Sequence, residues 1–198
     1  MRELIRMVFV LTIISAVSGV ALSGLNAMTA GIIKTTKLEQ SYKPAVESLI
    51  QGYENDPIKE YIEIPAGKDD KGRELFKQIF PAKKGGKVFS IGLADKAAGG
   101  YGGEITVVLA IDVTKDSIMG VKVVDHKETK GLGTNQEAPF LGQFAGKSKV
   151  DEVKLKAMGG PLDGMSGATF SSTTISKATQ SALQYYLDNK DKILSQIK

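Results

Sequence analysis

The residues with the clearest chemical potential lie between positions 163 and 174. Residues 163–169 read DGMSGAT and residues 170–174 read FSSTT, directly ahead of a long helical pattern. Small residues let a ligand approach the backbone, and the free N–H groups and partial positive charge of a helix N-terminus hold phosphates well. A glycine loop that leads into a serine or threonine helix cap has the same appearance. The residues alone therefore leave a phosphate site and an ordinary helix cap both open.

The composition excludes several classes of redox site. The chain has no cysteine and one histidine, His126, which excludes disulfides, thiolate-bound zinc, iron–sulfur clusters, thioether-linked haem and bis-histidine haem. Redox chemistry would therefore require an organic cofactor. Neither common nucleotide-binding glycine fingerprint is present, and Ser166 lacks the surroundings of a hydrolase nucleophile.

A second block of residues precedes this string. Residues 101–104 (YGGE) open a long strand pattern, and residues 126–133 (HKETKGLG) follow the next strand pattern. Residues 101–104 and 126–133, taken together, resemble the corresponding stretches of the G subunit of the Rnf electron transport complex. Much of this pattern is shared with the C subunit of the sodium-pumping NADH:quinone reductase. One departure is Lys130, which stands where that family usually has proline. The string at 163–169 is similar to the signature D-x-x-[ST]-G-A-[ST] of FMN-binding domains that a flavin transferase modifies, and every specified position matches: Asp163, Ser166, Gly167, Ala168 and Thr169.

The resemblance implies a role for each matched residue. Thr169 would receive FMN from FAD as a covalent phosphoester, with Asp163 recognised by the flavin transferase. The remaining cofactor-binding residues that the resemblance implies are Ser166, Gly167, Ala168, Glu128, Thr129, Leu132, Gly133 and Tyr101. On the residues alone, the segment 128–133 is equally a turn that ends a strand, and Tyr101 is equally a surface tyrosine.

The same resemblance implies a flavoprotein that relays electrons within a multi-subunit complex, between ferredoxin and NAD, coupled to sodium or proton transport. Its partners would be the other Rnf subunits and, during maturation, the flavin transferase. The chain carries no complete active site or recognisable NAD site of its own. Three alternatives remain open: the equivalent C subunit of the sodium-pumping relative, an anchored binding or assembly module without cofactor, and a stand-alone flavin reductase.

An apolar N-terminus precedes these motifs. The segment from Met7 to Ile33 contains no charge and exceeds the roughly 20 residues that cross a bilayer core of about 30 Å. It predicts a transmembrane helix, with a cleaved signal peptide as the rival interpretation. The two arginines before it favour a cytoplasmic N-terminus, whereas the two lysines directly after it oppose that orientation. The short N-terminal tail tips the balance towards an extracytoplasmic main domain. We expect an anchor over residues 1–36 and one FMN-binding domain over residues 37–198.

The charge of the chain is concentrated beside that segment. The formal net charge is +4, and the first 37 residues hold four basic residues against one acidic residue. The rest of the chain is therefore close to neutral, which argues against nucleic-acid binding and points to the membrane instead.

The remaining patterns predict an α+β domain with an antiparallel sheet flanked by helices. Residues 38–55 read as helical, with Pro44 as a kink or restart and an end at residues 55–57. Strands are expected at 75–80, 87–93, 104–113 and 118–126, the last two as a hairpin. A short helix is expected at 139–144, and a long helix over 172–193 that packs on the sheet.

Overall fold

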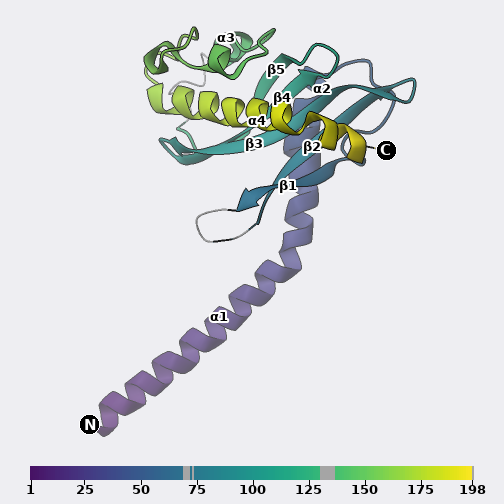
Figure 1. The fold of residues 1–198 in the computed structure, drawn as a ribbon. Coiled ribbons are helices and arrows are strands. Elements are labelled where there is room, and N and C mark those ends of the chain that lie inside the picture. Colours follow the sequence, from purple (N-terminus) through teal and green to yellow (C-terminus); the bar gives the residue numbers. More distant parts are fainter. Residues whose placement is uncertain (69–71, 73, 130–136, 198) are drawn as a thin grey trace. The chain divides into compact units, whose positions relative to one another are not determined.

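The computed structural model describes residues 1–68, 72, 74–129 and 137–197. The chain divides into two units, Met1–Gln40 and Ser41–Lys198 (Figure 1). Lys130, Leu132 and Gly133, which carry part of the family resemblance, lie outside the described residues.

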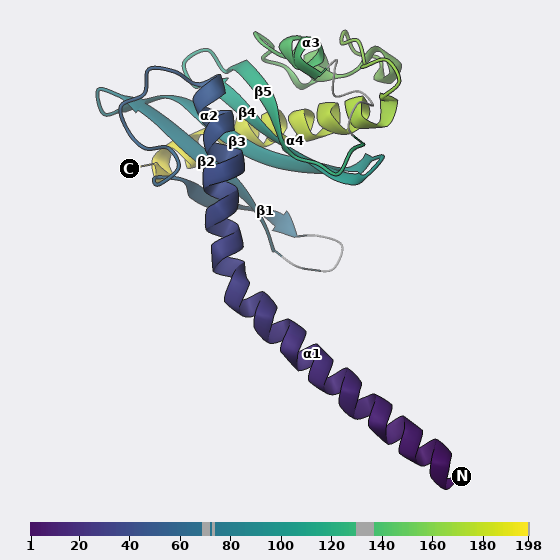
Figure 2. The same cartoon turned by 180° about the vertical axis from the view of Figure 1, so that it is seen from behind.

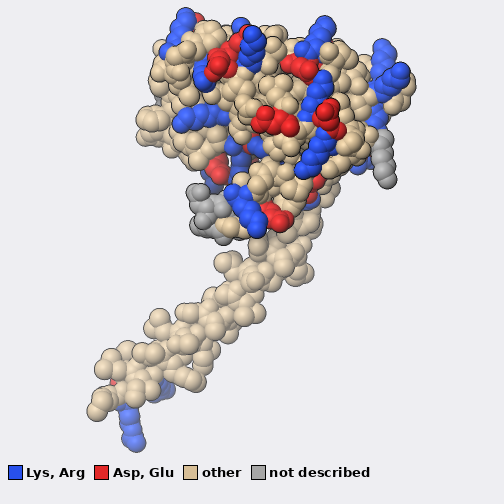
Figure 3. All heavy atoms as spheres, in the orientation of Figure 1, with Lys and Arg blue, Asp and Glu red and all other residues tan. Residues whose placement is uncertain are grey.

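The first unit is one long helix. α1 spans Arg2–Lys37 and continues into a π-helical turn at Leu38–Tyr42. At about 1.5 Å per residue its length is about 54 Å. None of its residues is buried against the described part of the chain, and Figure 3 shows its surface as largely uncharged between the two ends. A helix that is apolar on all sides requires an apolar surrounding, and this one is long and apolar enough to cross a membrane.

The second unit is built on a five-stranded antiparallel sheet in the order β1-β2-β3-β4-β5. Every connection between neighbouring strands is therefore a hairpin. The predicted α+β class with an antiparallel sheet and flanking helices is confirmed. The strands are β1 Ile62–Lys68, β2 Glu74–Lys84, β3 Lys87–Gly100, β4 Gly103–Asp112 and β5 Ser117–Asp125, and the helices of this unit are α2 Lys43–Leu49, α3 Glu137–Gly142 and α4 Thr169–Gln196, with short 3₁₀ turns at Val150–Val153 and Lys156–Met158.

Helices cover both faces of the sheet. α4 lies along one face and α2 crosses the other (Figures 1 and 2). The α4 side holds the main core, a buried cluster that includes Leu109 of β4 together with Ala182 and Tyr186 of α4. Val108 and Ala110, on the face of β4 opposite to Leu109, are also fully buried. The α2 helix explains this, because it brings a second small apolar layer onto that face.

Glycines form the tight turn between β2 and β3. Lys84 pairs with Lys87 across a two-residue turn, in which Gly85 and Gly86 have φ of 56° and 74°. Positive φ at both central residues matches the right-handed twist of the flanking strands, and glycine adopts it without strain. The strands on either side of this turn, β2 and β3, are longer than the predicted ranges 75–80 and 87–93.

Three element boundaries differ from the sequence prediction. The helix after Pro44 ends at Leu49 instead of at residues 55–57, because Ile50 is extended and buried. β1 was not predicted, since it is an edge strand that contains Pro65 and a glycine, residues that lower strand propensity. The terminal helix starts at Thr169 instead of residue 172, so Thr169 is a helical residue and not a loop residue.

The C-terminal half of α4 is fastened to the β4–β5 turn by a polar contact. The hydroxyl of the fully buried Tyr186 and the ammonium of Lys190 each donate to Asp116 Oδ1, both at 2.6 Å. Asp116 has a φ of 52°, a conformation that aspartate and asparagine tolerate better than most residues. Burial raises the pKa of Tyr186, and the bond to Asp116 raises it further.

We predict that Asp116→Asn weakens this contact in a pH-dependent way. Burial opposes ionisation of Asp116, but the bonds from Lys190 and Tyr186 outweigh it and hold its pKa below the ordinary 3.8. The ionised carboxylate therefore stabilises the fold above that pH and ceases to do so as the pH falls through the lowered pKa. The variant should lose about 1 kcal/mol at pH 7, since solvent screens a half-exposed pair. Urea denaturation should show the difference shrinking toward pH 3; a constant difference would contradict the prediction.

Candidate functional site

The first turn of α4 presents Thr169 at the surface. Thr169 is exposed and is the first residue of the helix, after Ala168 at the N-cap position. The preceding turn closes with the Ala168 N–H donating to the Met165 carbonyl at 3.1 Å, and Gly167 adopts a φ of 73° within it. No atom of the described residues lies within 4 Å of where a Cβ on Gly167 would stand, so the described surroundings leave the space beside the threonine open.

The buried Ser172 holds this turn from the core side of α4. Ser172 Oγ accepts the Met165 N–H and donates to the Ala168 carbonyl, both at 2.8 Å. The Ser172 N–H also donates to the Ala168 carbonyl at 2.9 Å. Because Ser172 is fully buried, these bonds form away from solvent and hold the turn in one conformation against the helix.

Asp163, at the start of the same string, is held by its backbone. The Gln143 amide donates to the Asp163 carbonyl at 3.1 Å and accepts the Asp163 N–H at 2.9 Å. The carboxylate is exposed and forms an ion pair with Lys156 at 2.7 Å. The backbone is thus fixed, while the charged group faces solvent.

The motif blocks, far apart in the sequence, meet at Glu128. One carboxylate oxygen accepts the Gly102 N–H at 2.8 Å, and the other accepts the hydroxyl of Ser171 in the first turn of α4. His126 supports the same segment, since its Nδ1 accepts the Glu128 N–H at 3.1 Å. The structure therefore brings residues 101–104, 126–129 and 163–174 into one site.

Comparison with known proteins identifies this arrangement. The FMN-binding domain family matches residues 100–184, the part of the chain that contains all three motif segments. Residues 100–184 form an FMN-binding domain. FMN is accordingly the cofactor of this chain, and the predicted resemblance is confirmed.

Two G subunits of ion-translocating oxidoreductase complexes are similar to this chain over most of its length. The G subunit of the ion-translocating oxidoreductase complex of Pseudomonas aeruginosa is 29% identical, with 98% of this chain and 94% of that protein covered. The G subunit from Haemophilus influenzae strain Rd is also 29% identical, over 90% of this chain and 84% of that protein. The C subunit of the Na⁺-translocating NADH-quinone reductase from Parabacteroides distasonis is a solved structure with 27% identity and a TM-score of 0.43, covering 57% of this chain and 61% of that one.

The residues of the FMN-binding domain fit a phosphate-bearing planar cofactor. The first turn of a helix leaves the N–H groups of Thr169, Phe170 and Ser171 without intrahelical partners, and its partial charge favours an anion. Two aromatic side chains are exposed beside this turn: Phe170 is 67% exposed, and Tyr101, next to Gly102, is 80% exposed. An apolar ring system could pack against either. FMN would supply electron transfer to such a site.

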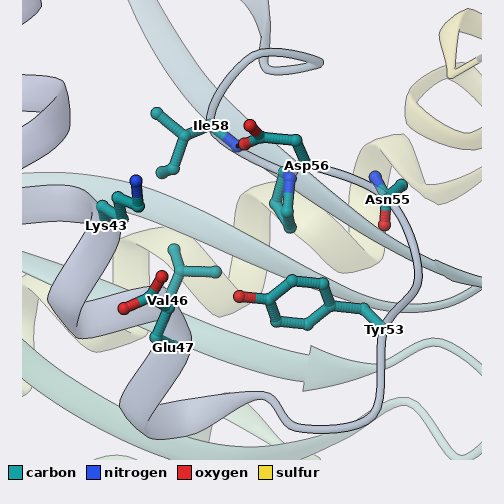
Figure 4. Close-up of a pocket in the computed structure, with 8 residues that line it drawn as sticks. Lys43, Val46, Glu47, Tyr53, Asn55, Asp56 and Ile58 are labelled. Atoms are coloured by element: carbon teal, nitrogen blue, oxygen red, sulfur yellow. Dashed lines mark hydrogen bonds between the residues drawn. The ribbon is translucent and has the colours of Figure 1, made fainter.

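A separate pocket lies on the α2 side of the second unit. Its volume is about 210 Å³, and the Tyr53 hydroxyl points toward Glu47 across it (Figure 4). Burial raises the pKa of Tyr53, and the neighbouring Glu47 and Asp56 raise it further. The pocket shares no lining residue with the three motif segments, so it is distinct from the site at Thr169. Its lining residues are Lys43, Val46, Glu47, Tyr53, Asn55, Asp56, Pro57 and Ile58.

Sequence reasoning missed several residues of the FMN-binding domain that hold the site together. Ser171 and Ser172 were visible as part of a hydroxyl cluster, but their partners are 43 and 7 residues away. Nothing in the sequence indicated that the Gln143 amide would bond to the backbone of Asp163. The glycine pair 102–103 was noticed as a motif, and the close approach of Lys127 now explains Gly102. Thr129 is exposed at the end of the described segment, beside Glu128.

Proposed function

We propose that this chain is the FMN-carrying subunit of a membrane-bound, ion-translocating oxidoreductase complex of the Rnf type, with FMN joined to Thr169 through a phosphoester bond. The observation that carries the proposal is the position of Thr169. Its hydroxyl is exposed on the first turn of a 28-residue helix, beside an open glycine turn and next to the other two motif segments. An anchored chain with a tethered flavin can receive and pass electrons without losing its cofactor.

The attachment reaction follows from the groups involved. The Thr169 oxygen forms a bond to the phosphorus on the FMN side of FAD, and the pyrophosphate bond breaks. AMP leaves, and the hydroxyl proton passes to the medium or to a base of the transferase. Ser166, Gly167 and Ala168 give the small, open approach that this reaction needs, since only one side chain of the three is larger than a methyl group.

In this proposal residues 1–36 anchor the chain in the membrane, which is the role that the apolar α1 and the relatives from the oxidoreductase complex support. Residues 37–198 form the FMN-binding domain on the extracytoplasmic side, because Arg2 and Arg6 ahead of the apolar segment favour the cytoplasm. The partners are the other subunits of the complex and the flavin transferase. Electrons pass between ferredoxin and NAD through the complex, and ion transport is coupled to that flow.

In-gel fluorescence tests the proposal. The full-length chain is co-expressed with a flavin transferase in cells that make FAD, purified in detergent and run on a denaturing gel. The proposal predicts flavin fluorescence that survives denaturation, because a phosphoester is covalent. A colourless band despite active transferase would overturn the covalent assignment and would favour an anchored assembly module without cofactor.

Copurification separates the two complexes in which such a subunit is expected. The similarity of the chain to the G subunits favours the Rnf type over the sodium-pumping NADH:quinone reductase. Rnf subunits in the detergent-purified membrane complex would support the assignment. Subunits of the quinone reductase would instead make this chain the equivalent C subunit, and purification as an active single chain would make it a stand-alone flavin reductase.

Asp163 is expected to serve the transferase and not the fold. Asp163→Ala removes only an exposed ion pair with Lys156, so the free energy of unfolding should change by less than about 0.5 kcal/mol. Flavin incorporation, measured as the flavin absorbance per mole of protein, should nevertheless fall by about tenfold if the transferase recognises the carboxylate. Lys156→Ala is the matched control, because it breaks the same ion pair; equal losses in both variants would remove Asp163 from the recognition role.

A further inference from the structure

The environment of Glu128 is built around its carboxylate. Its two oxygens accept bonds from different elements, the Gly102 N–H in the β3–β4 turn and the Ser171 hydroxyl in α4. A carboxylate can accept several bonds at once without an unmet donor of its own. Glu128 thus joins a sheet turn to a helix terminus that is 43 residues away in sequence.

Glycines make room for this carboxylate. A Cβ on Gly100 would lie 2.7 Å from Glu128 Oε1, and a Cβ on Gly102 would lie 2.0 Å from the Lys127 carbonyl oxygen. Both positions therefore need glycine for the backbone of the β3–β4 turn to approach residues 127 and 128. The approach brings the Gly102 N–H within bonding distance of the carboxylate.

The same contacts keep the carboxylate charged. Burial opposes ionisation, but the hydrogen bonds from Ser171 and from the backbone N–H groups of Gly102 and Tyr101 outweigh it, with help from His126. Together they hold the pKa of Glu128 below its ordinary value. An anion at the N-terminal turn of α4 is also favoured by the helix dipole.

The hydrogen bond between Glu128 and Ser171 restrains Thr169, because Ser171 and Thr169 lie in the same first turn of α4. Ser171 lies two residues after Thr169, and the following residue, Ser172, is locked to the Met165–Ala168 turn from the buried side. The first turn of α4 is therefore held at two points, by Ser172 from below and by Glu128 from the β3–β4 turn. A helix terminus held at two points cannot rock without breaking a bond.

We infer that Glu128 is a positioning residue of the flavin site: by joining Ser171 to Gly102, it fixes the direction in which Thr169 presents its cofactor. This inference rests on the proposed function for the cofactor itself. The role of Glu128 is then to orient the attachment point through α4, in addition to any contact of the glutamate with the flavin ring.

A double-mutant cycle on the full-length chain tests whether Glu128 and Ser171 stabilise the fold together. Glu128→Gln, Ser171→Ala and the double variant are compared in a Thr169→Ala background, which carries no tethered flavin. We expect each single variant to raise the unfolding equilibrium constant on the order of tenfold and the double variant to be little worse than either single one. Additive effects would show that the two side chains do not act together and would overturn the inference.

Fluorescence anisotropy of the covalent flavin tests the positioning role. With Thr169 intact and flavin attached, Glu128→Gln and Ser171→Ala should both lower the anisotropy at unchanged flavin content. A control variant, Glu60→Gln, makes the same chemical change outside the three motif segments, where the carboxylate forms an ion pair with Lys83 at 2.7 Å. It should leave the anisotropy at the wild-type value.

The two experiments distinguish the role of Glu128 from the covalent attachment. Coupled stabilities with unchanged anisotropy would make Glu128 a structural brace only and would overturn the positioning role. A wild-type chain without flavin at Thr169 would defeat the proposed function, and with it the role of Glu128 toward the cofactor, whereas the coupling in the flavin-free background would still be measurable.

Discussion

Thr169→Ala is expected to abolish covalent flavin attachment while leaving the chain folded. The hydroxyl oxygen of Thr169 is the proposed acceptor of the phosphoryl group, and alanine has no atom that could replace it. The side chain is exposed, and alanine is a good residue for the first turn of a helix. The free energy of unfolding should therefore change by less than about 0.5 kcal/mol, while in-gel flavin fluorescence falls to background.

Thr169→Ser is the matched control for this variant. Serine keeps the hydroxyl, and the signature that the sequence resembles accepts serine or threonine at this position, so fluorescence should persist. The neighbouring variant Ser166→Ala should also keep its fluorescence. Fluorescence that survives in Thr169→Ala but disappears in Ser166→Ala would move the attachment point to Ser166.

The second large effect is expected from Gly102→Ala, through the fold of the site. The added methyl group would stand 2.0 Å from the Lys127 carbonyl oxygen and 2.4 Å from its carbon. Both atoms belong to the backbone, so neither can turn away, and the β3–β4 turn must separate from residues 127 and 128. That movement also weakens the bond from the Gly102 N–H to Glu128. We expect a loss of about 3 kcal/mol or more, measured by thermal denaturation of the full-length chain in detergent.

Gly142→Ala supplies the comparison. Gly142 ends α3, its φ is not positive, and no atom of the described residues lies within 4 Å of where a Cβ would stand. Alanine there should change the stability by no more than about 1 kcal/mol in either direction. Equal midpoints for the two alanine variants would show that the close approach of Gly102 to Lys127 does not exist.

The sequence was most informative where local pattern and tertiary packing agree. β4, β5 and α4 have strong periodicity, and the apolar positions on their core-facing sides are buried, among them Leu109, Ile118 and Ala182. β1 could not be predicted, since an edge strand is selected by its pairing with β2 and its own residues, including Pro65, argue against a strand. Likewise the end of α2 at Leu49 follows from the burial of Ile50, which no local breaker signals.

The motifs of the candidate site could be predicted from the sequence, but the contacts that bring them together could not. The residues alone do not separate a phosphate site at Thr169 from a helix cap, and the resemblance to a family is what favours the phosphate site. The structure adds that Ala168 is the N-cap residue and forms no side-chain cap bond within the described part of the chain, so the capping interpretation loses its main support. The Glu128–Ser171 contact had no local signal, because it depends on how the sheet presents its turns to α4.

The charges around Thr169 are compatible with the proposed phosphate, although the Glu128 carboxylate lies in the same site. Glu128 uses both oxygens for bonds to Gly102 and Ser171, and its charge is offset by the helix terminus. The side chain of Thr169 is exposed to solvent, where water screens a second anion. The proposed tether at Thr169 would also leave the flavin ring accessible to another protein.

Mass spectrometry of one tryptic peptide tests the central claim most directly. Cleavage after Lys156 and Lys177 releases residues 157–177 (AMGGPLDGMSGATFSSTTISK), which contain Thr169 and the other hydroxyl residues of the string. For wild-type protein matured with flavin transferase, we predict that this peptide gains the mass of FMN less one water. Fragmentation should place that added mass on Thr169. FMN on any other residue of the peptide, or an unmodified peptide from a fluorescent protein, would contradict the assignment of Thr169 as the tether.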